Sequence, residues 1–294
     1  MATEPLDLLV VGGGIMGASV FRDAALRGMR VGLVEAGDFA SATSGRSSKL
    51  IHGGLRYLKG MGFRLARESC RERNLHVRLN KRLVRPMPFL VPLYQGRQPS
   101  RSTMRLGMGL YEALSGFSNH RLHRFPSREE TLSMAPALSP NGLTGGCLYY
   151  DAVVSDMRWT VETVKDGARH GGVAVNYAPL TGLRKRGGKV VGGRVRDRLD
   201  DREYEVRAKA VVNATGVFAD RIRRMDDACS RPLVRLSKGT HLVFAEEDAP
   251  LSVTVVFSSP LDGRSLFLAK REGCFLYGTS DDWKTRTRTP PPPP

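Results

Sequence analysis

The segment LDLLVVGGGIMGASVFRDAALRGMRVGLVE, residues 6–35, contains the pattern that decides the fold. A short apolar run, residues 6–11, ends at three consecutive glycines, and an amphipathic stretch leads to a second apolar run, residues 31–34. Short apolar runs bounded by glycine are typical of buried parallel strands, and the stretch between them has a helical period. The segment therefore predicts a strand–helix–strand unit.

Three glycines in this unit occupy the positions of a phosphate-binding turn. Gly12, Gly14 and Gly17 match the pattern G-x-G-x-x-G. The first allows a tight turn, the second lets the backbone approach a pyrophosphate, and the third lets the helix pack closely on the sheet. The phosphates would lie at the helix N-terminus, beside Ile15 and Met16, where backbone N–H groups and the helix dipole favour negative charge.

Glu35 ends the second strand, where a carboxylate can accept hydrogen bonds from an adenosine ribose. Ala36 and Gly37 follow it, so the arginine that would bind the 2′-phosphate of NADP is missing and NADP is disfavoured. A glycine turn alone also fits an ordinary strand-to-helix connection. Because strand, turn, helix, second strand and terminal acid agree, the sequence predicts a dinucleotide site.

The composition indicates a globular protein with a substantial core. A chain of 294 residues can form two domains or one large α/β domain. The net charge of +17 suggests anionic partners, but the basic residues are spread along the chain and no nucleic-acid-binding module appears. We therefore expect anionic substrates or an anionic membrane surface, and no nucleic acid.

The cysteines show no spacing typical of a metal or redox site. They lie far apart, at Cys70, Cys147, Cys229 and Cys274, so no bound metal and a reducing, cytoplasmic location are expected. The N-terminal apolar run is broken by glycines and then by charged residues, which excludes a signal peptide or membrane span there. Membrane contact would then be peripheral, on the cytoplasmic face.

Residues 37–58 read as a ligand-binding loop that leads into a cluster of reactive side chains. Its first half is rich in small and hydroxyl residues, which can lie flat against a ligand and donate hydrogen bonds. The alternative is a solvated linker. His52, Arg56 and Tyr57 follow within six residues and favour the ligand-binding interpretation.

The string SSKLIHGGLRYL, residues 47–58, together with the glycine turn and Glu35, resembles FAD-dependent glycerol-3-phosphate dehydrogenases. These belong to a wider group of flavin amine and hydroxy-acid oxidases with the same FAD fold. The resemblance covers nearly all of residues 5–283. It implies FAD as the cofactor and an α/β fold, in which a Rossmann-like FAD-binding domain of the glutathione-reductase type carries an inserted α+β substrate domain.

Residues 62–84 predict a long amphipathic helix, and the proline-rich run at residues 85–92 ends it and marks a candidate crossing into the substrate domain. The FAD-binding domain is expected over residues 1–85 and 151–232, and the substrate domain over residues 86–150 and 233–284. Residues 285–294, which end in five prolines, are expected to form a disordered tail. One departure from the family pattern is Val217-Phe218, where the family usually has Pro-Trp.

The cofactor-binding residues that the resemblance implies come from the glycine turn, from the loop after Glu35, and from two later segments that are similar to the family's adenine-framing strand and second FAD-contact turn. They are Gly12, Gly14, Ile15, Met16, Gly17, Glu35, Ala36, Thr43, Ser44, Ser47, Ser48, Leu50, His52, Gly53, Gly54, Ala174, Ala214, Thr215 and Gly216.

The candidate catalytic residues are His52, Arg56, Tyr57, Lys238 and His241. An imidazole titrates near neutral pH, so either His52 or His241 could take the proton of a substrate hydroxyl, and the sequence leaves this choice open. Arg56 suits a phosphate or carboxylate, and Tyr57 could add a hydrogen bond. Lys238 and His241 belong to a segment that resembles the family's substrate-facing strand.

The expected activity is oxidation of glycerol 3-phosphate to dihydroxyacetone phosphate, with electrons passed to a quinone. The family's later arginine and its Gly-Gly-Lys-Leu-Thr-Thr segment do not occur here, so a truncated chain of doubtful activity is expected. One alternative is a related amine or hydroxy-acid oxidase, and another is a non-catalytic fragment that binds a nucleotide. The oligomeric state stays open.

Overall fold

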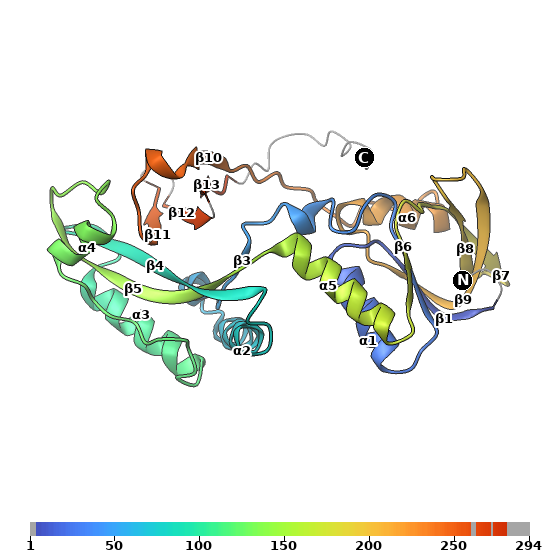
Figure 1. The fold of residues 1–294 in the computed structure, drawn as a ribbon, viewed down its shortest axis with the longest axis horizontal. Helices are drawn as coiled ribbons and strands as arrows, with labels where there is room; N and C mark the ends of the chain where they lie inside the picture. Colours follow the sequence, from blue (N-terminus) through green and yellow to red (C-terminus); the bar gives the residue numbers. More distant parts are fainter. Residues whose placement is uncertain (1–3, 260–262, 272, 281–294) are drawn as a thin grey trace. The chain divides into compact units, whose positions relative to one another are not determined.

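The computed structural model describes residues 4–259, 263–271 and 273–280, and they form two compact units. The first unit combines the chain up to Ser47 with Ser155–Ser237. The second combines Ser48–Val154 with the segment that begins at Lys238. Figure 1 shows the order of the elements along the chain.

The first unit contains a six-stranded sheet around the predicted strand–helix–strand unit. The strand β1 (Leu6–Val11) pairs in parallel with β2 (Val31–Val34) and with β9 (Glu203–Asn213). The sheet order is β6-β2-β1-β9-β8-β7, with β6 at Val173–Val175, β7 at Leu180–Arg186 and β8 at Lys189–Arg196. The predicted Rossmann-like α/β fold is confirmed.

Two helices of the first unit pack side by side, α1 (Ile15–Leu26) and α5 (Asp156–Arg169) (Figure 1). Phe21 of α1 is fully buried, and its ring fills the space where a side chain at Gly167 or Gly172 would lie. A short helix, α6 (Ala219–Asp226), follows the one-turn helix η3 (Gly216–Phe218).

The second unit contains a seven-stranded sheet of order β10-β13-β12-β11-β4-β5-β3. The longest pair is β4 (Val84–Tyr94) with β5 (Leu143–Val154), which run antiparallel. The other strands are β3 (Leu50–Ile51), β10 (Leu242–Ala245), β11 (Thr254–Ser258), β12 (Ser265–Arg271) and β13 (Cys274–Gly278).

Alternation along β4 divides the core of the second unit between two sets of helices. Phe89 packs with residues of α2 (Phe63–Leu79) and α3 (Arg101–Leu114), whereas its neighbour Leu90 packs in a separate cluster that includes Ala135, just after α4 (Arg128–Met134). Short helices η1 (Thr43–Gly45), η2 (Leu55–Gly60) and η4 (Glu246–Asp248) lie in the connections.

The observed division differs most from the expected boundaries at the first crossing, which lies at Ser47 and not at residue 85. The reason is α2. Its buried face, which includes Ala66 and Cys70, packs against the second unit, so the whole helix belongs there. The later crossings lie at Val154 and Ser237, where residues 150 and 232 were expected. The proline tail, residues 285–294, lies outside the described residues.

The sequence KAVVNATG, residues 209–216, reads as a buried strand that ends in a small-residue turn, but the strand is less buried than this pattern predicts. Lys209 and Ala210 are exposed, and Val211 and Val212 are only partly buried. This part of β9 pairs with β1, but the partnership of β9 with β8 ends at Arg207. Within the part of the chain that the structure describes, the outer edge of residues 208–213 therefore has no neighbouring strand.

The contact of Phe21 with α5 predicts a large loss of stability in Phe21→Ala. The ring is fully buried, so its removal leaves a cavity between α1 and α5 and should lower the free energy of unfolding by about 3–5 kcal/mol. Chemical denaturation followed by circular dichroism measures this. The control is Leu26→Ala on the same helix, where Leu26 is 45% exposed and the expected change is below about 0.5 kcal/mol. Equal losses in both variants would contradict the packing described.

Candidate functional site

The glycine turn of the first unit depends on two positions that have no room for a side chain. Gly12 has φ +108°, and a Cβ there would lie 2.6 Å from the carbonyl oxygen of Ala214. A Cβ at Gly17 would overlap the carbonyl oxygen of Gly12. The turn, the start of α1 and the end of β9 are therefore packed backbone to backbone, as the sequence predicts.

The N-terminus of α1 has no negative charge of its own and presents backbone N–H groups that could bind an anion. The helix begins at Ile15, its N-cap Gly14 provides no side-chain cap, and its first turn holds no acidic residue. Ser44 Oγ accepts the N–H of Ile15 at 2.9 Å. The other N–H groups of the first turn have no acceptor inside the helix, so an anion can bind them.

Glu35 is held beside this turn by two backbone groups. Its carboxylate accepts the N–H of Gly13 at 2.6 Å and the N–H of Gly37 at 2.8 Å. Each carboxylate oxygen has further acceptor capacity, so the same group can accept ribose hydroxyls. Met16, the second residue of α1, is 69% exposed and leaves the first turn of this helix accessible.

The other predicted cofactor residues of the first unit divide into two groups. Ser44 and Ala214 adjoin the turn, and the N–H of Ala214 donates to the carbonyl oxygen of Val11 at 2.8 Å. The remaining residues do not adjoin the turn and lie in the sheet or in the connections. Ala174 pairs with Leu33 in the sheet, Thr215 donates to Asn213 at 2.6 Å, Gly216 has φ +55°, Ser47 donates to Asp156 at 2.7 Å, and Ala36 and Thr43 lie in the connection after β2.

The predicted residues of the second unit follow one another around β3 and η2. His52 and Tyr57 lie edge to face, with ring centroids 5.9 Å apart, and the Arg56 guanidinium lies 5.3 Å from the centre of the Tyr57 ring. Gly54 has φ +79°, which permits the bend between His52 and η2. The structure therefore brings His52, Arg56 and Tyr57 together.

His241 reaches the same segment from a distant part of the chain. Its Nε2 lies 3.4 Å from Ser48 Oγ, and Arg271 donates to the carbonyl oxygen of Ser48. Thr240, its neighbour, exchanges backbone and side-chain hydrogen bonds with Ser280. Lys238 is exposed. Both candidate bases thus belong to the second unit, one at each end of the segment from Ser48 to His52.

Both histidines favour the neutral form. Burial lowers the pKa of His52, the Asp151 carboxylate opposes this shift, and the Arg56 and Arg73 cations add to it. Burial also lowers the pKa of His241, and the Arg271 cation lowers it further. A neutral imidazole can accept a proton, so both residues keep the ability to act as a base.

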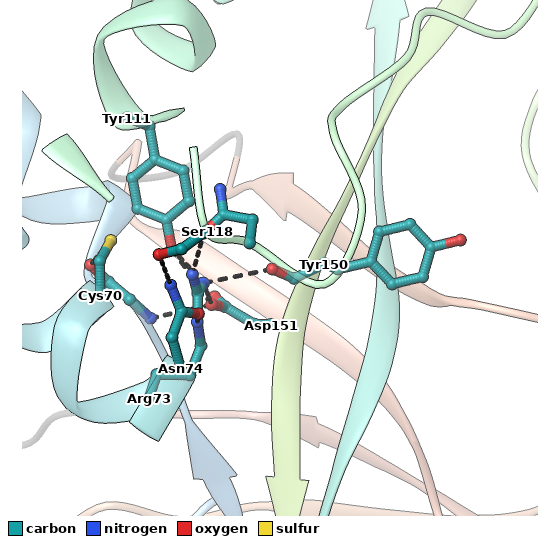
Figure 2. Close-up of polar contacts among 9 residues, drawn as sticks. Cys70, Arg73, Asn74, Tyr111, Ser118, Tyr150 and Asp151 are labelled. Carbon is teal, nitrogen blue, oxygen red and sulfur yellow. Dashed lines mark hydrogen bonds and ion pairs between the residues drawn. The ribbon is translucent and has the colours of Figure 1, made fainter. Parts of the chain in front are cut away.

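Sequence reasoning missed three buried polar residues behind His52: Arg73, Tyr111 and Asp151. They are 2%, 0% and 5% exposed, and they contact one another (Figure 2). The signal in the sequence is weak. Arg73 follows Ala66 and Cys70 at helical spacing on the buried face of α2, but a single arginine on such a face ordinarily reads as a solvated charge.

The described residues contain neither a candidate metal site nor a helix that could cross a membrane. Among residues 4–259, 263–271 and 273–280, no group of three or more His, Cys, Asp or Glu side chains could hold a metal ion. In the same ranges, no helix has the length and apolar character needed to cross a bilayer.

The lowered pKa of His52 predicts that stability falls in mild acid. Below the ordinary histidine pKa of 6.5 the unfolded chain binds a proton that the folded chain does not, so stability is present above pH 6.5 and is lost as pH falls toward the folded value. We expect the urea midpoint to fall between pH 7 and 5, and to fall less in His52→Gln. His170→Gln is the surface-histidine control. If the urea midpoint of His52→Gln fell with pH as steeply as that of the unaltered chain, the prediction would be contradicted.

Comparison with known proteins agrees with this geometry. The family model described as "FAD dependent oxidoreductase" matches residues 7–294. The aerobic glycerol-3-phosphate dehydrogenase of Bacillus subtilis (strain 168) is 38% identical over 281 residues, which are 96% of this chain and 50% of that protein. The protein of the same name from Staphylococcus haemolyticus (strain JCSC1435) is 35% identical over 99% of this chain and 52% of its own length.

Solved structures give the same picture. Glycerol-3-phosphate dehydrogenase from Bacillus halodurans, complexed with FAD, superimposes with a TM-score of 0.76 at 33% identity, over 98% of this chain and 49% of that chain. L-alpha-glycerophosphate oxidase from Mycoplasma pneumoniae, with FAD bound, gives 0.68 at 18% identity over 97% and 76%, which shows a shared fold.

The chain spans about half the length of the curated relatives it matches. The family model nevertheless covers nearly all of it, including the glycine turn, Glu35 and the segment around His52. The resemblance expected from residues 47–58 is therefore confirmed, and the chain belongs to the FAD dependent oxidoreductase family.

Proposed function

We propose that this chain binds FAD and takes part in the oxidation of glycerol 3-phosphate. The observation that carries the proposal is the pairing of two features: a dinucleotide turn with Glu35 in the first unit, and the His52, Arg56 and Tyr57 cluster in the second. Relatives that are 35–38% identical over almost the whole chain have the name aerobic glycerol-3-phosphate dehydrogenase.

The residues of the first unit fit FAD. The pyrophosphate would bind the N-terminus of α1, where Gly14 leaves room for close approach, and the adenosine ribose would bind Glu35. Ala174, on the strand next to β2, would lie along the adenine. FAD, when bound, supplies an acceptor for a hydride.

The second unit offers the groups that a phosphorylated alcohol needs. Arg56 is exposed and can bind a phosphate with its guanidinium fork, and Tyr57 lies beside it to donate a further hydrogen bond. Burial lowers the pKa of His52 and so favours the neutral imidazole, which would accept the proton of the substrate hydroxyl as the hydride leaves its carbon. We place His52 before His241 as the base because Arg56 and Tyr57 lie with it in one cluster.

Two alternative functions have weaker support. Amine and hydroxy-acid oxidases share the fold, but solved examples such as glycine oxidase from Geobacillus kaustophilus are only 18% identical, which supports the fold alone. A non-catalytic nucleotide-binding fragment is consistent with the chain's share of its relatives' length. Residues 47–58 favour the glycerol 3-phosphate assignment, because the dinucleotide turn and Glu35 belong to the first unit, and nucleotide binding there gives no role to the His52, Arg56 and Tyr57 cluster of the second unit.

Separate losses of cofactor and substrate binding test the proposal. The purified chain should show flavin absorbance that bleaches when glycerol 3-phosphate is added without oxygen. Glu35→Gln should weaken FAD binding roughly 10- to 100-fold, because a charge-assisted hydrogen bond contributes about 1.5–3 kcal/mol. Arg56→Ala should weaken the response to glycerol 3-phosphate by a similar factor and leave FAD binding unchanged. Flavin fluorescence and anaerobic absorbance measure the two affinities.

The control is Arg64→Ala, an exposed arginine on α2, which should change neither affinity. Parallel losses of FAD and substrate binding in Arg56→Ala would refute its substrate role. Colourless protein would favour the non-catalytic fragment, and bleaching by an amino acid in place of glycerol 3-phosphate would favour the oxidase.

We also propose that the electron acceptor is a membrane quinone and that the second unit contacts the bilayer through the outer face of α3. Leu106, Leu110 and Phe117 are 78%, 39% and 68% exposed. Arg101 and Arg105 flank them, and the single acidic residue between positions 80 and 127 is Glu112, which is buried. An apolar face bordered by arginines is suited to an anionic lipid surface.

Vesicle binding measures this contact. Leu106→Asp with Leu110→Asp should lower the fraction bound to phosphatidylglycerol-containing vesicles by at least roughly tenfold, because burying a leucine contributes about 1.5–3 kcal/mol. Leu199→Asp is the matched control, since Leu199 is 82% exposed in a connection of the first unit. Equal binding by both variants, or no binding by the unaltered chain, would refute the membrane contact at α3.

A further inference from the structure

A buried polar cluster lies directly behind the His52 segment. Arg73 of α2 forms an ion pair with Asp151 of β5, and Arg73 Nη1 donates to Tyr111 Oη of α3 at 2.8 Å. The Tyr111 hydroxyl donates in turn to Asp151 Oδ1 at 3.1 Å. Arg73 also donates to Asn119 and to the carbonyl oxygen of Tyr150, at 3.2 Å for the latter. Figure 2 shows these groups converging from three elements.

Both backbone polar groups of Gly53 form hydrogen bonds with buried side chains, one with Asp151 of this cluster and one with the neighbouring Cys70. The N–H of Gly53 donates to Asp151 Oδ1 at 2.8 Å, and the thiol of Cys70 donates to the carbonyl oxygen of Gly53 at 3.2 Å. A Cβ at Gly53 would overlap the Tyr111 hydroxyl and lie 2.7 Å from Arg73 Nη1. The peptide on either side of Gly53 is therefore fixed by side chains from α2, α3 and β5.

The energetics of the ion pair indicate a role besides stability. Taking two charges out of water costs about as much as their attraction returns, and apolar residues of similar size often stabilise a core equally well. Apolar residues could not, however, accept the N–H of Gly53. A single oxygen, Asp151 Oδ1, serves three donors: Gly53, Arg73 and Tyr111.

We propose that Arg73, Tyr111 and Asp151 are positioning residues that hold the His52–Gly53 peptide and thereby aim His52 at the substrate. This proposal rests on the proposed function, because the orientation of His52 affects the reaction only if His52 acts as the base. His52 precedes the held residue directly, and Gly54, with φ +79°, begins the turn into η2, which presents Arg56 and Tyr57. One anchored residue thus sets the base and the phosphate-binding side chains together.

The charges around His52 provide a signature of this arrangement. The groups that act on it are Asp151 from β5, Arg73 from α2, and Arg56 from η2, with the Tyr57 ring beside it. The Asp151 carboxylate raises the pKa of His52, whereas the two arginines lower it. Neutralising Asp151 should therefore lower the pKa of His52 further.

The first test separates positioning from stability. In the 294-residue chain, Arg73→Met with Asp151→Leu replaces the ion pair by apolar side chains of similar size. We expect the urea midpoint to fall moderately, because the N–H of Gly53 and the Tyr111 hydroxyl lose their buried acceptor. Hydrogen exchange of the Gly53 amide, measured by NMR, should accelerate roughly 10- to 100-fold more than exchange of the amides in β4, because the loss is local.

The second test uses Asp151→Asn and follows the His52 ring signals against pH. The pKa of His52 should fall, and titration of His241 should stay unchanged. Glu112→Gln is the matched control: Glu112 is a buried carboxylate next to Tyr111 on α3, but it accepts from the backbone N–H of His123 at 2.7 Å and does not contact Gly53. It should alter neither Gly53 exchange nor the His52 titration.

Two results would overturn the proposal. One is Gly53 exchange that accelerates no more than exchange of the β4 amides in the double variant. The other is an Asp151→Asn variant in which stability falls as in Glu112→Gln while the His52 titration stays the same. If one variant fails to fold, the other still decides. Failure of the unaltered chain to bind or reduce flavin would reject the proposed function and leave these NMR measurements intact, so the two failures are distinguishable.

Discussion

The first unit depends on direct backbone contact at the glycine turn. The carbonyl oxygen of Gly12 fills the space of a side chain at Gly17, and the carbonyl oxygen of Ala214 fills the space of one at Gly12. Because no Cβ intervenes, the end of β1, the start of α1 and the end of β9 meet at one point. The N-terminus of α1 and the carboxylate of Glu35 follow from that point, so any larger residue would disturb the cofactor site as a whole.

In the second unit, side chains hold a short irregular segment of the chain in one conformation. The segment from Ser48 to Tyr57 includes only a two-residue strand, β3, and the short helix η2. Such a segment has few backbone hydrogen bonds of its own. Asp151 and Cys70 bind the backbone of Gly53, and Arg271 binds that of Ser48. Side chains from regular elements thus replace the missing ladder of backbone hydrogen bonds.

Local sequence patterns predicted the helices and strands well, but they did not predict as well which sheet or unit each element packs against. The helix α2 was expected, and the boundary at residue 85 placed it in the FAD-binding domain, whereas it packs within the second unit. Amphipathic periodicity shows that a helix has an apolar face but not which sheet that face covers. Residues 209–212 read as a buried strand for a similar reason. Their apolar character is local, whereas their exposure depends on whether another strand lies at the edge of β9.

The sequence by itself determined the glycine turn, the place of Glu35 at the end of the second strand and the candidates His52, Arg56 and Tyr57, because each depends on residues that are close together in the chain. Only the tertiary structure decided that Arg73, Tyr111 and Asp151 meet behind Gly53, since these residues come from α2, α3 and β5. It also placed His241 beside Ser48. Such contacts depend on how distant elements pack, and no local pattern of residues encodes that packing.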